Sequence, residues 1–118
     1  MSNIESVIES YVASWNETDP ARRQSSLAAS CAANASYRDP VMVSDGQSGL
    51  DAMLAGVQAK FPGFVLRRIS KVDCHNDAVR FAWSLGPASR PSVVEGVDFC
   101  ELTPEGKLVE VVGFIDKM

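Results

Sequence analysis

The sequence predicts an α+β fold in which three N-terminal helices pack on a strongly curved, mainly antiparallel sheet. The N-terminal half carries apolar residues at helical spacing, whereas the C-terminal half alternates apolar and polar residues over long segments joined by short turns. Helices that precede a run of antiparallel strands are typical of this class, because they can gather on one face of the sheet. Such a sheet forms a cone, and the inside of a cone is a natural small-molecule pocket.

The first predicted helix is the clearest element of the sequence. Six apolar residues recur at helical spacing and share one face: Ile4, Val7, Ile8, Tyr11, Val12 and Trp15. A second helix is predicted from about residue 20 to residue 32, because Asp19 is a good N-cap and Pro20 fits the first helical turn. Its apolar face is thinner than that of the first helix.

A third helix is predicted to open at Ser48 and Asp51, which resemble a capping box, and to stop at Pro62-Gly63. The remaining segments are typical of strands bounded by turn residues. The predicted strands span residues 35–38, 41–43, 64–73, 79–85, 92–103 and 107–116. The whole chain, residues 1–118, is expected to form one domain, since it contains no linker or repeat.

Composition excludes several classes of protein. With 46% hydrophobic residues and a net charge of −4, the chain is too apolar and too weakly charged to be disordered. It has no basic block for nucleic acid, no signal peptide and no apolar stretch of membrane-spanning length. Three scattered cysteines, Cys31, Cys74 and Cys100, do not make a disulfide framework and are expected to be buried apolar residues. We expect a cytoplasmic protein that binds neither nucleic acid nor membranes.

Two carboxyl groups and one tyrosine are the candidates for chemistry. Asp98 shares its strand face with small and apolar residues only. If that face points inward, the carboxyl stays protonated in an apolar site; at a sheet edge or in an ion pair it is an ordinary carboxylate. Asp39 lies in a loop made rigid by Pro40, where functional residues concentrate, although Asp-Pro also starts ordinary turns. Tyr11 lies on the buried helix face, where its hydroxyl needs a partner.

Aromatic side chains could line a pocket or fill a core, and the sequence leaves both open. The aromatic candidates are Trp15, Phe61, Phe64, Phe81 and Trp83. Either Trp83 or its neighbours on the same strand could face the cavity. His75 is the only histidine and lies in a predicted turn, which suits a solvated side chain better than a metal ligand. We therefore expect no metal site and no cofactor.

Taken together, these positions resemble the SnoaL-like superfamily with the nuclear transport factor two (cystatin-like) cone fold, which includes the ketosteroid isomerases. The similarity covers nearly the whole chain. It rests on Tyr11-Val12-Ala13, Asp39-Pro40-Val41, the Gly49 region and Asp98 before the Gly106-Lys107 hairpin. The Asp-Pro element is shared by members of differing function, whereas the combination of one tyrosine with two aspartates is more specific to the isomerases.

The resemblance implies catalytic roles for three residues. In the isomerases, a tyrosine at the place of Tyr11 and a protonated aspartic acid at the place of Asp98 donate hydrogen bonds to the substrate oxygen. An aspartate at the place of Asp39 is the base that moves a proton between carbons beside a carbonyl. Two donors aimed at a developing enolate oxygen stabilise the transition state, and the carboxylate supplies general base catalysis.

We therefore expect a protein that binds a small, largely apolar carbonyl compound and isomerises or cyclises it by proton transfer. Three alternate residues of the last predicted strand complete the expected pocket: Val111, Gly113 and Ile115. The alternative is a non-catalytic ligand-binding or dimerisation module of the same fold. A homodimer is expected through an apolar patch on the outer sheet face. The patch would consist of Val97, Phe99, Val112 and Phe114.

Overall fold

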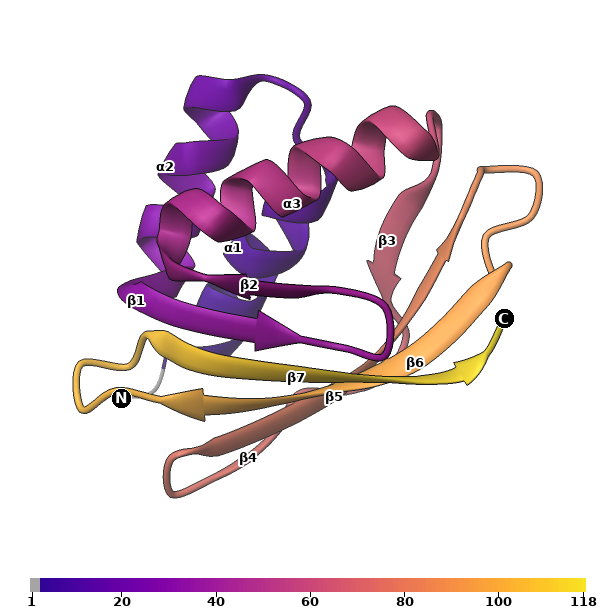
Figure 1. Ribbon diagram of the computed structural model, residues 1–118. Helices are drawn as coiled ribbons and strands as arrows, with labels where there is room; N and C mark the ends of the chain where they lie inside the picture. The colour runs from indigo at the N-terminus through magenta and orange to yellow at the C-terminus, as the bar shows by residue number, and fades with distance from the viewer. Residues whose placement is uncertain (1–2) are drawn as a thin grey trace.

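A computed structural model describes residues 3–118, which form three helices and seven strands. The helices are α1 (Ile4–Asn16), α2 (Pro20–Ser30) and α3 (Gly46–Lys60). The strands are β1 (Cys31–Arg38), β2 (Val43–Asp45), β3 (Val65–Arg68), β4 (Asp73–His75), β5 (Ala78–Gly86), β6 (Val94–Leu102) and β7 (Leu108–Lys117). The predicted fold class is confirmed: three helices pack on a curved sheet (Figure 1).

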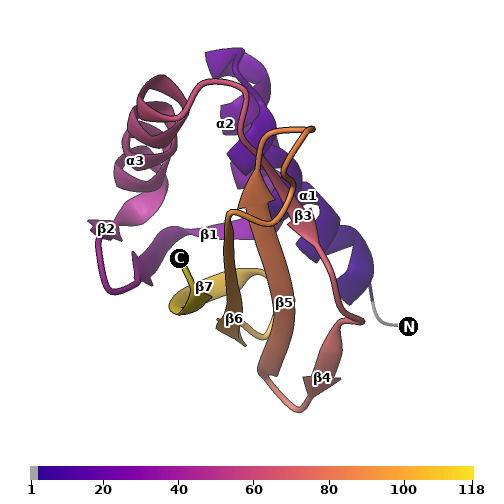
Figure 2. The ribbon, with the colours of Figure 1, turned by 90° about the vertical axis from the view of Figure 1, so that its right-hand side faces the viewer.

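The strands form one mixed sheet in the order β2-β1-β7-β6-β5-β3, with β4 paired to β5. Neighbouring strands are antiparallel except β1 and β7, which run parallel. The β6–β7 ladder shifts register beside Gly96 and beside Leu102, and such bulges bend a sheet. In Figure 1 the long strands curve beneath the helices. Figure 2 shows the molecule from the end at which the C-terminus lies.

The core lies between the helices and the concave face of the sheet. The apolar face predicted for α1 is the face it buries, with Ile8 and Tyr11 completely enclosed. On β5, Phe81 and Trp83 point inward while Arg80 is exposed. The sequence left open which side chains of this strand face the cavity, and the structure shows that Trp83 does.

Two helix boundaries differ from the prediction. Helix α2 ends at Ser30, where the Ser30 hydroxyl donates to the Ser26 carbonyl at 2.8 Å, and β1 begins at once at Cys31. The predicted capping box is wrong, because α3 begins earlier, at Gly46, whose φ of 76° suits a glycine. Asp51 faces Arg23 of α2 instead of capping its own helix.

The predicted strand 64–73 is also wrong as one piece, because it breaks after Arg68 into β3 and β4. At the break, the Ser70 hydroxyl oxygen accepts the Ala82 backbone N–H at 2.8 Å, so a side chain takes the place of a ladder carbonyl. The predicted turn at Cys74 starts two residues later, at Asn76, whose φ is 52°. Short side chains that bond to the backbone therefore decide these boundaries.

A buried cation joins α2 to α3. The Arg23 side chain is only 5% exposed, and its Nε donates to Asp51 Oδ1 at 2.6 Å. Its Nη1 donates to the Glu17 carbonyl at 3.1 Å and to Gln58 Oε1 at 3.2 Å. Since a buried guanidinium needs all its partners, this network fixes the packing of the two helices.

We expect Arg23→Ala to lower the free energy of unfolding by about 3 kcal/mol, because it removes the charged partner of Asp51 and a donor to the Glu17 carbonyl and Gln58. Urea unfolding followed by circular dichroism measures the change. Arg22→Ala is the matched control, since the Arg22 side chain is 74% exposed and its loss should change stability by less than about 0.5 kcal/mol. Equal effects of the two changes would show that the buried network adds nothing.

Candidate functional site

A cavity of about 550 Å³ lies between α3, β3 and the C-terminal end of the sheet. Its wall is largely apolar, as in pockets for small organic ligands. Five of the predicted pocket residues line it: Trp15, Phe61, Phe64, Trp83 and Ile115. Asp39 and Asp98 also reach it, so the two candidate carboxyl groups share one cavity.

Further apolar wall residues were not assigned to the pocket from the sequence. They include Met42, Met53, Val57, Leu66, Leu85 and Val94. Met53 and Val57 lie on the apolar stripe that identifies α3 as a helix, so the signal for their burial was present. The helical pattern alone does not separate a residue that packs against a core from one that borders a cavity.

Asp98 is the buried acid of the cavity and is 2% exposed. The indole N–H of Trp83 donates to its Oδ1 at 2.9 Å. Burial raises the pKa of Asp98 from 3.8 to about 7; the Trp83 bond opposes the rise, and the negative charge of Asp39 adds to it. The Asp98 side chain therefore points inward, the first of the two possibilities that the sequence left open. A large share of Asp98 is neutral at pH 7.

Tyr11 lies beside Asp98 and behind the pocket wall. Its side chain is completely buried, packs edge-on against Trp15 and Phe81, and does not itself line the cavity. Burial, and then the Asp98 carboxyl, raise the pKa of the Tyr11 hydroxyl, so it stays protonated. Within residues 3–118 the hydroxyl has no hydrogen bond of normal geometry, and neither does the buried indole N–H of Trp15.

Asp39 is held as a hydrogen-bonded carboxylate at the end of β1. Its Oδ1 accepts the backbone N–H groups of Val41 and Met42 at 2.7 and 2.8 Å. Its Oδ2 accepts the hydroxyl of Tyr37 at 2.6 Å. The Asp-Pro loop thus does what an aspartate commonly does at the start of a turn, and it also fixes the carboxylate against the cavity.

Gly113 of β7 marks the point where the polar groups converge. A Cβ atom added to this glycine would lie 3.1 Å from Asp98 Oδ1, 3.1 Å from Asp39 Cβ and 3.3 Å from the Tyr37 hydroxyl. Asp39, Asp98 and Tyr37 therefore surround one spot on β7. Sequence reasoning did not include Tyr37 in the site, although it lies only two residues before Asp39, a spacing that puts side chains of an extended segment on the same side.

Three expected pocket residues do not line the cavity. Phe81 and Val111 are 1% exposed and belong to the core beneath it, so their assignment to the pocket wall is corrected. Gly113 packs under the two carboxyl groups without bordering the open space. Alternation along a strand predicts which side chains point inward. It does not predict which of them fill the core and which border the cavity.

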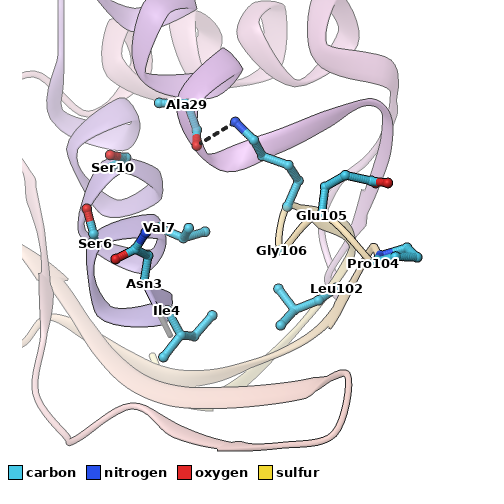
Figure 3. A pocket seen from close by; sticks show the side chains of 11 residues that line it. Asn3, Ile4, Ser6, Val7, Ser10, Ala29, Leu102, Pro104, Glu105 and Gly106 are labelled. Atoms are coloured by element: carbon cyan, nitrogen blue, oxygen red, sulfur yellow. Dashed lines mark hydrogen bonds between the residues drawn. The ribbon is translucent and has the colours of Figure 1, made fainter. Parts of the chain in front are cut away.

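A second cavity, of about 500 Å³, lies between the start of α1 and the β6–β7 turn (Figure 3). Lys107 borders it, and its Nζ donates to the carbonyls of Ala28 and Ala29 at 2.9 and 3.0 Å. These carbonyls belong to the last turn of α2, where a lysine side chain commonly donates hydrogen bonds. None of the candidate site residues lies here.

The remaining sequence candidates are dispersed. Across residues 3–118, no three His, Cys, Asp or Glu side chains gather closely enough to hold a metal ion. His75 is exposed, and its Nδ1 pairs with the Asn76 amide at 3.0 Å. Cys31 and Cys100 are buried as predicted, whereas Cys74 is exposed on β4. No helix within the described part of the chain is long and apolar enough to cross a membrane.

Comparison with known proteins relates this architecture to one family. The SnoaL-like domain profile matches residues 8–111. A "putative isomerase of the SnoaL-like family" from Agrobacterium tumefaciens str. C58 is 35% identical, with a TM-score of 0.90 over 98% of this chain and 99% of that chain. A "putative SnoaL-like polyketide cyclase" from Jannaschia sp. CCS1 is 17% identical, with a TM-score of 0.69 over 98% and 90% of the two chains. No match was found among curated proteins.

A curved mixed sheet covered by helices, with an apolar cavity that ends in a buried acid, defines a small α+β cone of the cystatin-like, nuclear transport factor two-like fold. The chain belongs to the SnoaL-like family, whose profile spans most of its length. The family resemblance predicted from the sequence is thereby confirmed.

Proposed function

We propose that the protein catalyses proton transfer next to a carbonyl group of a small, largely apolar ligand, as an isomerase or cyclase of the ketosteroid isomerase type. One observation carries the proposal: a buried acid, Asp98, and a fixed carboxylate, Asp39, meet at the same side of an apolar cavity. Groups of one type in environments that differ this much are suited to separate acid and base roles. The description of the similar A. tumefaciens protein as a "putative isomerase" also supports it.

In the proposed reaction Asp39 is the base. Its carboxylate removes a proton from the carbon beside the carbonyl, and the electron pair of the broken C–H bond moves to the carbonyl oxygen to give an enolate. An isomerase returns the proton from Asp39 to another carbon of the conjugated system. A cyclase uses the enolate carbon to attack a second carbonyl of the same ligand; the first carbonyl re-forms, and the new alkoxide oxygen takes the proton held by Asp39. Either course needs a base that stays in place, which the three hydrogen bonds to Asp39 provide.

The enolate oxygen is proposed to lie against Asp98 and Tyr11. Neutral Asp98 donates its O–H to this oxygen, and the desolvated setting strengthens the bond. Tyr11 is proposed as the second donor, because its buried and protonated hydroxyl lies beside the Asp98 carboxyl, behind the cavity wall. The ligand needs no metal or cofactor for this chemistry.

A spectroscopic assay with small β,γ-unsaturated ketones tests the proposal, because isomerisation to the conjugated ketone raises ultraviolet absorbance. We expect the protein to accelerate this rise above the rate in buffer. A rate equal to that in buffer for every ketone that binds would overturn the proposal and leave a ligand-binding module. Binding itself can be followed by tryptophan fluorescence, since Trp15 and Trp83 border the cavity.

The second proposal concerns assembly, whether or not the protein is an enzyme. We propose a homodimer through the outer face of β6 and β7, where Phe99 and Phe114 are 40% and 55% exposed. They pair across the ladder with Val112 and Val97, which makes the apolar patch continuous. A cytoplasmic location also stays a prediction.

We expect Phe99→Lys combined with Phe114→Lys to convert the dimer to a monomer, because two charges would be buried in the interface. Sedimentation velocity measures the state. Val43→Lys is the matched control, since Val43 is 74% exposed on β2 and lies outside the patch. An unchanged sedimentation coefficient of the double variant, or a monomeric starting protein, would refute the interface.

A further inference from the structure

The bond between Trp83 and Asp98 is a feature of this cavity that the proposed chemistry does not yet use. The two side chains come from adjacent strands, β5 and β6, and both border the cavity. Trp83 is 8% exposed and Asp98 is 2% exposed, so the N–H···O bond of 2.9 Å lies out of bulk water. Among residues 3–118 it is the one hydrogen bond of normal geometry to the Asp98 side chain.

The strand register builds this contact. Trp83 pairs directly with Gly96, and Asp98 is the next residue on the same face of β6. A Cβ atom on Gly96 would come within 2.5 Å of Trp83 Cζ2 and 2.1 Å of the Phe114 carbonyl oxygen. Only glycine therefore lets the indole lie across β6 and reach the carboxyl diagonally.

The chemistry of the indole makes this contact directional. An indole N–H can donate a hydrogen bond but cannot accept one, so the oxygen that it contacts must remain an acceptor. In a neutral carboxyl the carbonyl oxygen is the stronger acceptor, and the other oxygen carries the O–H. The Trp83 bond therefore assigns the acceptor role to Oδ1.

We propose that Trp83 is a positioning residue, which holds Asp98 Oδ1 as an acceptor so that Oδ2 is the oxygen that carries and donates the proton. One consequence of this role rests on the proposed function: the orientation of the Asp98 O–H toward an enolate oxygen. The role of Trp83 itself does not. The state of the carboxyl can be measured without any turnover, so the two can fail separately.

The other titratable groups around Asp98 do not replace this contact. Tyr11 approaches from α1, Tyr37 and Asp39 from β1 and the loop after it, and Cys100 from β6 itself. Burial raises the pKa values of both tyrosines and of the Cys100 thiol, so these three are neutral. Asp39 is the only charged neighbour in this set, and its negative charge favours the neutral form of Asp98. Trp83 favours the charged form, because a donor stabilises a carboxylate more than a carboxylic acid, and the Tyr11 hydroxyl does so to a smaller extent.

Carbon-13 NMR titration of protein labelled at the aspartate carboxyl carbons tests the proposal, with the Asp98 signal assigned by its loss in Asp98→Asn. We expect Trp83→Phe to raise the pKa of Asp98 by about one unit, since a charge-favouring hydrogen bond is lost. Trp15→Phe is the matched control: Trp15 also borders the cavity, but within residues 3–118 its N–H makes no hydrogen bond to Asp98. It should leave the Asp98 titration in place.

A second variant separates the lost donor from any change in packing. In the Trp15→Phe background, tryptophan at position 83 can be replaced biosynthetically by benzothienylalanine, which keeps the ring shape and has sulfur instead of N–H. The same upward shift is expected. An unchanged or lowered pKa of Asp98 in the benzothienyl protein, or an equal shift in Trp15→Phe alone, would overturn the role of Trp83, whether or not ketones are turned over.

Discussion

Replacing Asp39 with asparagine is expected to lower the turnover of an unsaturated ketone by a factor of about 10² to 10⁴, because the amide cannot take up the proton. Asparagine keeps the shape of the side chain, and its oxygen can still accept the backbone N–H groups of Val41 and Met42. The loop should therefore persist, and the loss should appear in kcat more than in ligand binding. The ultraviolet isomerisation assay measures the rate, and fluorescence titration measures binding.

The control for this change is Asp45→Asn, since Asp45 is exposed on β2 and its side chain caps nothing. Its turnover should equal that of the unchanged protein. Equal turnover of Asp39→Asn and the unchanged protein would remove Asp39 from the base role. A parallel loss of binding and turnover would instead make Asp39 a ligand-binding group.

Replacing Asp98 with asparagine is expected to change how stability depends on pH. The pKa of Asp98 is raised to about 7 in the folded protein from 3.8 as a free group, so the folded state holds a proton that the unfolded state loses. The stability that Asp98 contributes is therefore greatest at low pH and declines as pH rises toward 7. Asparagine has no such proton, and its oxygen can still accept the Trp83 N–H.

Between about pH 5 and about pH 8, the free energy of unfolding of Asp98→Asn should therefore rise relative to the unchanged protein by about 3 kcal/mol. Urea unfolding at a series of pH values measures the difference. Asp77→Asn, at an exposed turn, should show no such trend. A pH-independent difference for Asp98→Asn would mean that Asp98 is ionised throughout, and a neutral donor in the cavity would then be excluded.

Local sequence patterns predict much of this architecture. The period of α1 places Tyr11 and Trp15 on the buried face, and the alternation on β6 places Asp98 among small inward residues. Both follow from geometry that a helix or strand imposes on its own sequence. The sequence thus placed Asp98 on a face of small and apolar residues, and the structure shows that this face points inward.

Other parts of the site depend on contacts between distant segments. The partner of Tyr37 is two residues away, but its approach to Asp98 depends on the parallel pairing of β1 with β7. The reach of Trp83 to Asp98 depends on the register that sets Gly96 opposite the indole. Likewise, the spacing of Asp51 fits a capping box, yet its carboxylate accepts a hydrogen bond from Arg23 of another helix. Register and interhelical packing are not visible in spacing along one segment.

The most direct measurement uses a ketone that binds to the protein. Proton NMR in D₂O follows the exchange of hydrogen for deuterium at the carbon beside its carbonyl group. This exchange reports formation of the enolate itself and requires no completed isomerisation or cyclisation. We predict that the protein accelerates loss of that proton signal and that Asp39→Asn returns the rate to that of buffer. A ketone that saturates the tryptophan fluorescence signal yet exchanges at the buffer rate would contradict proton transfer in this cavity.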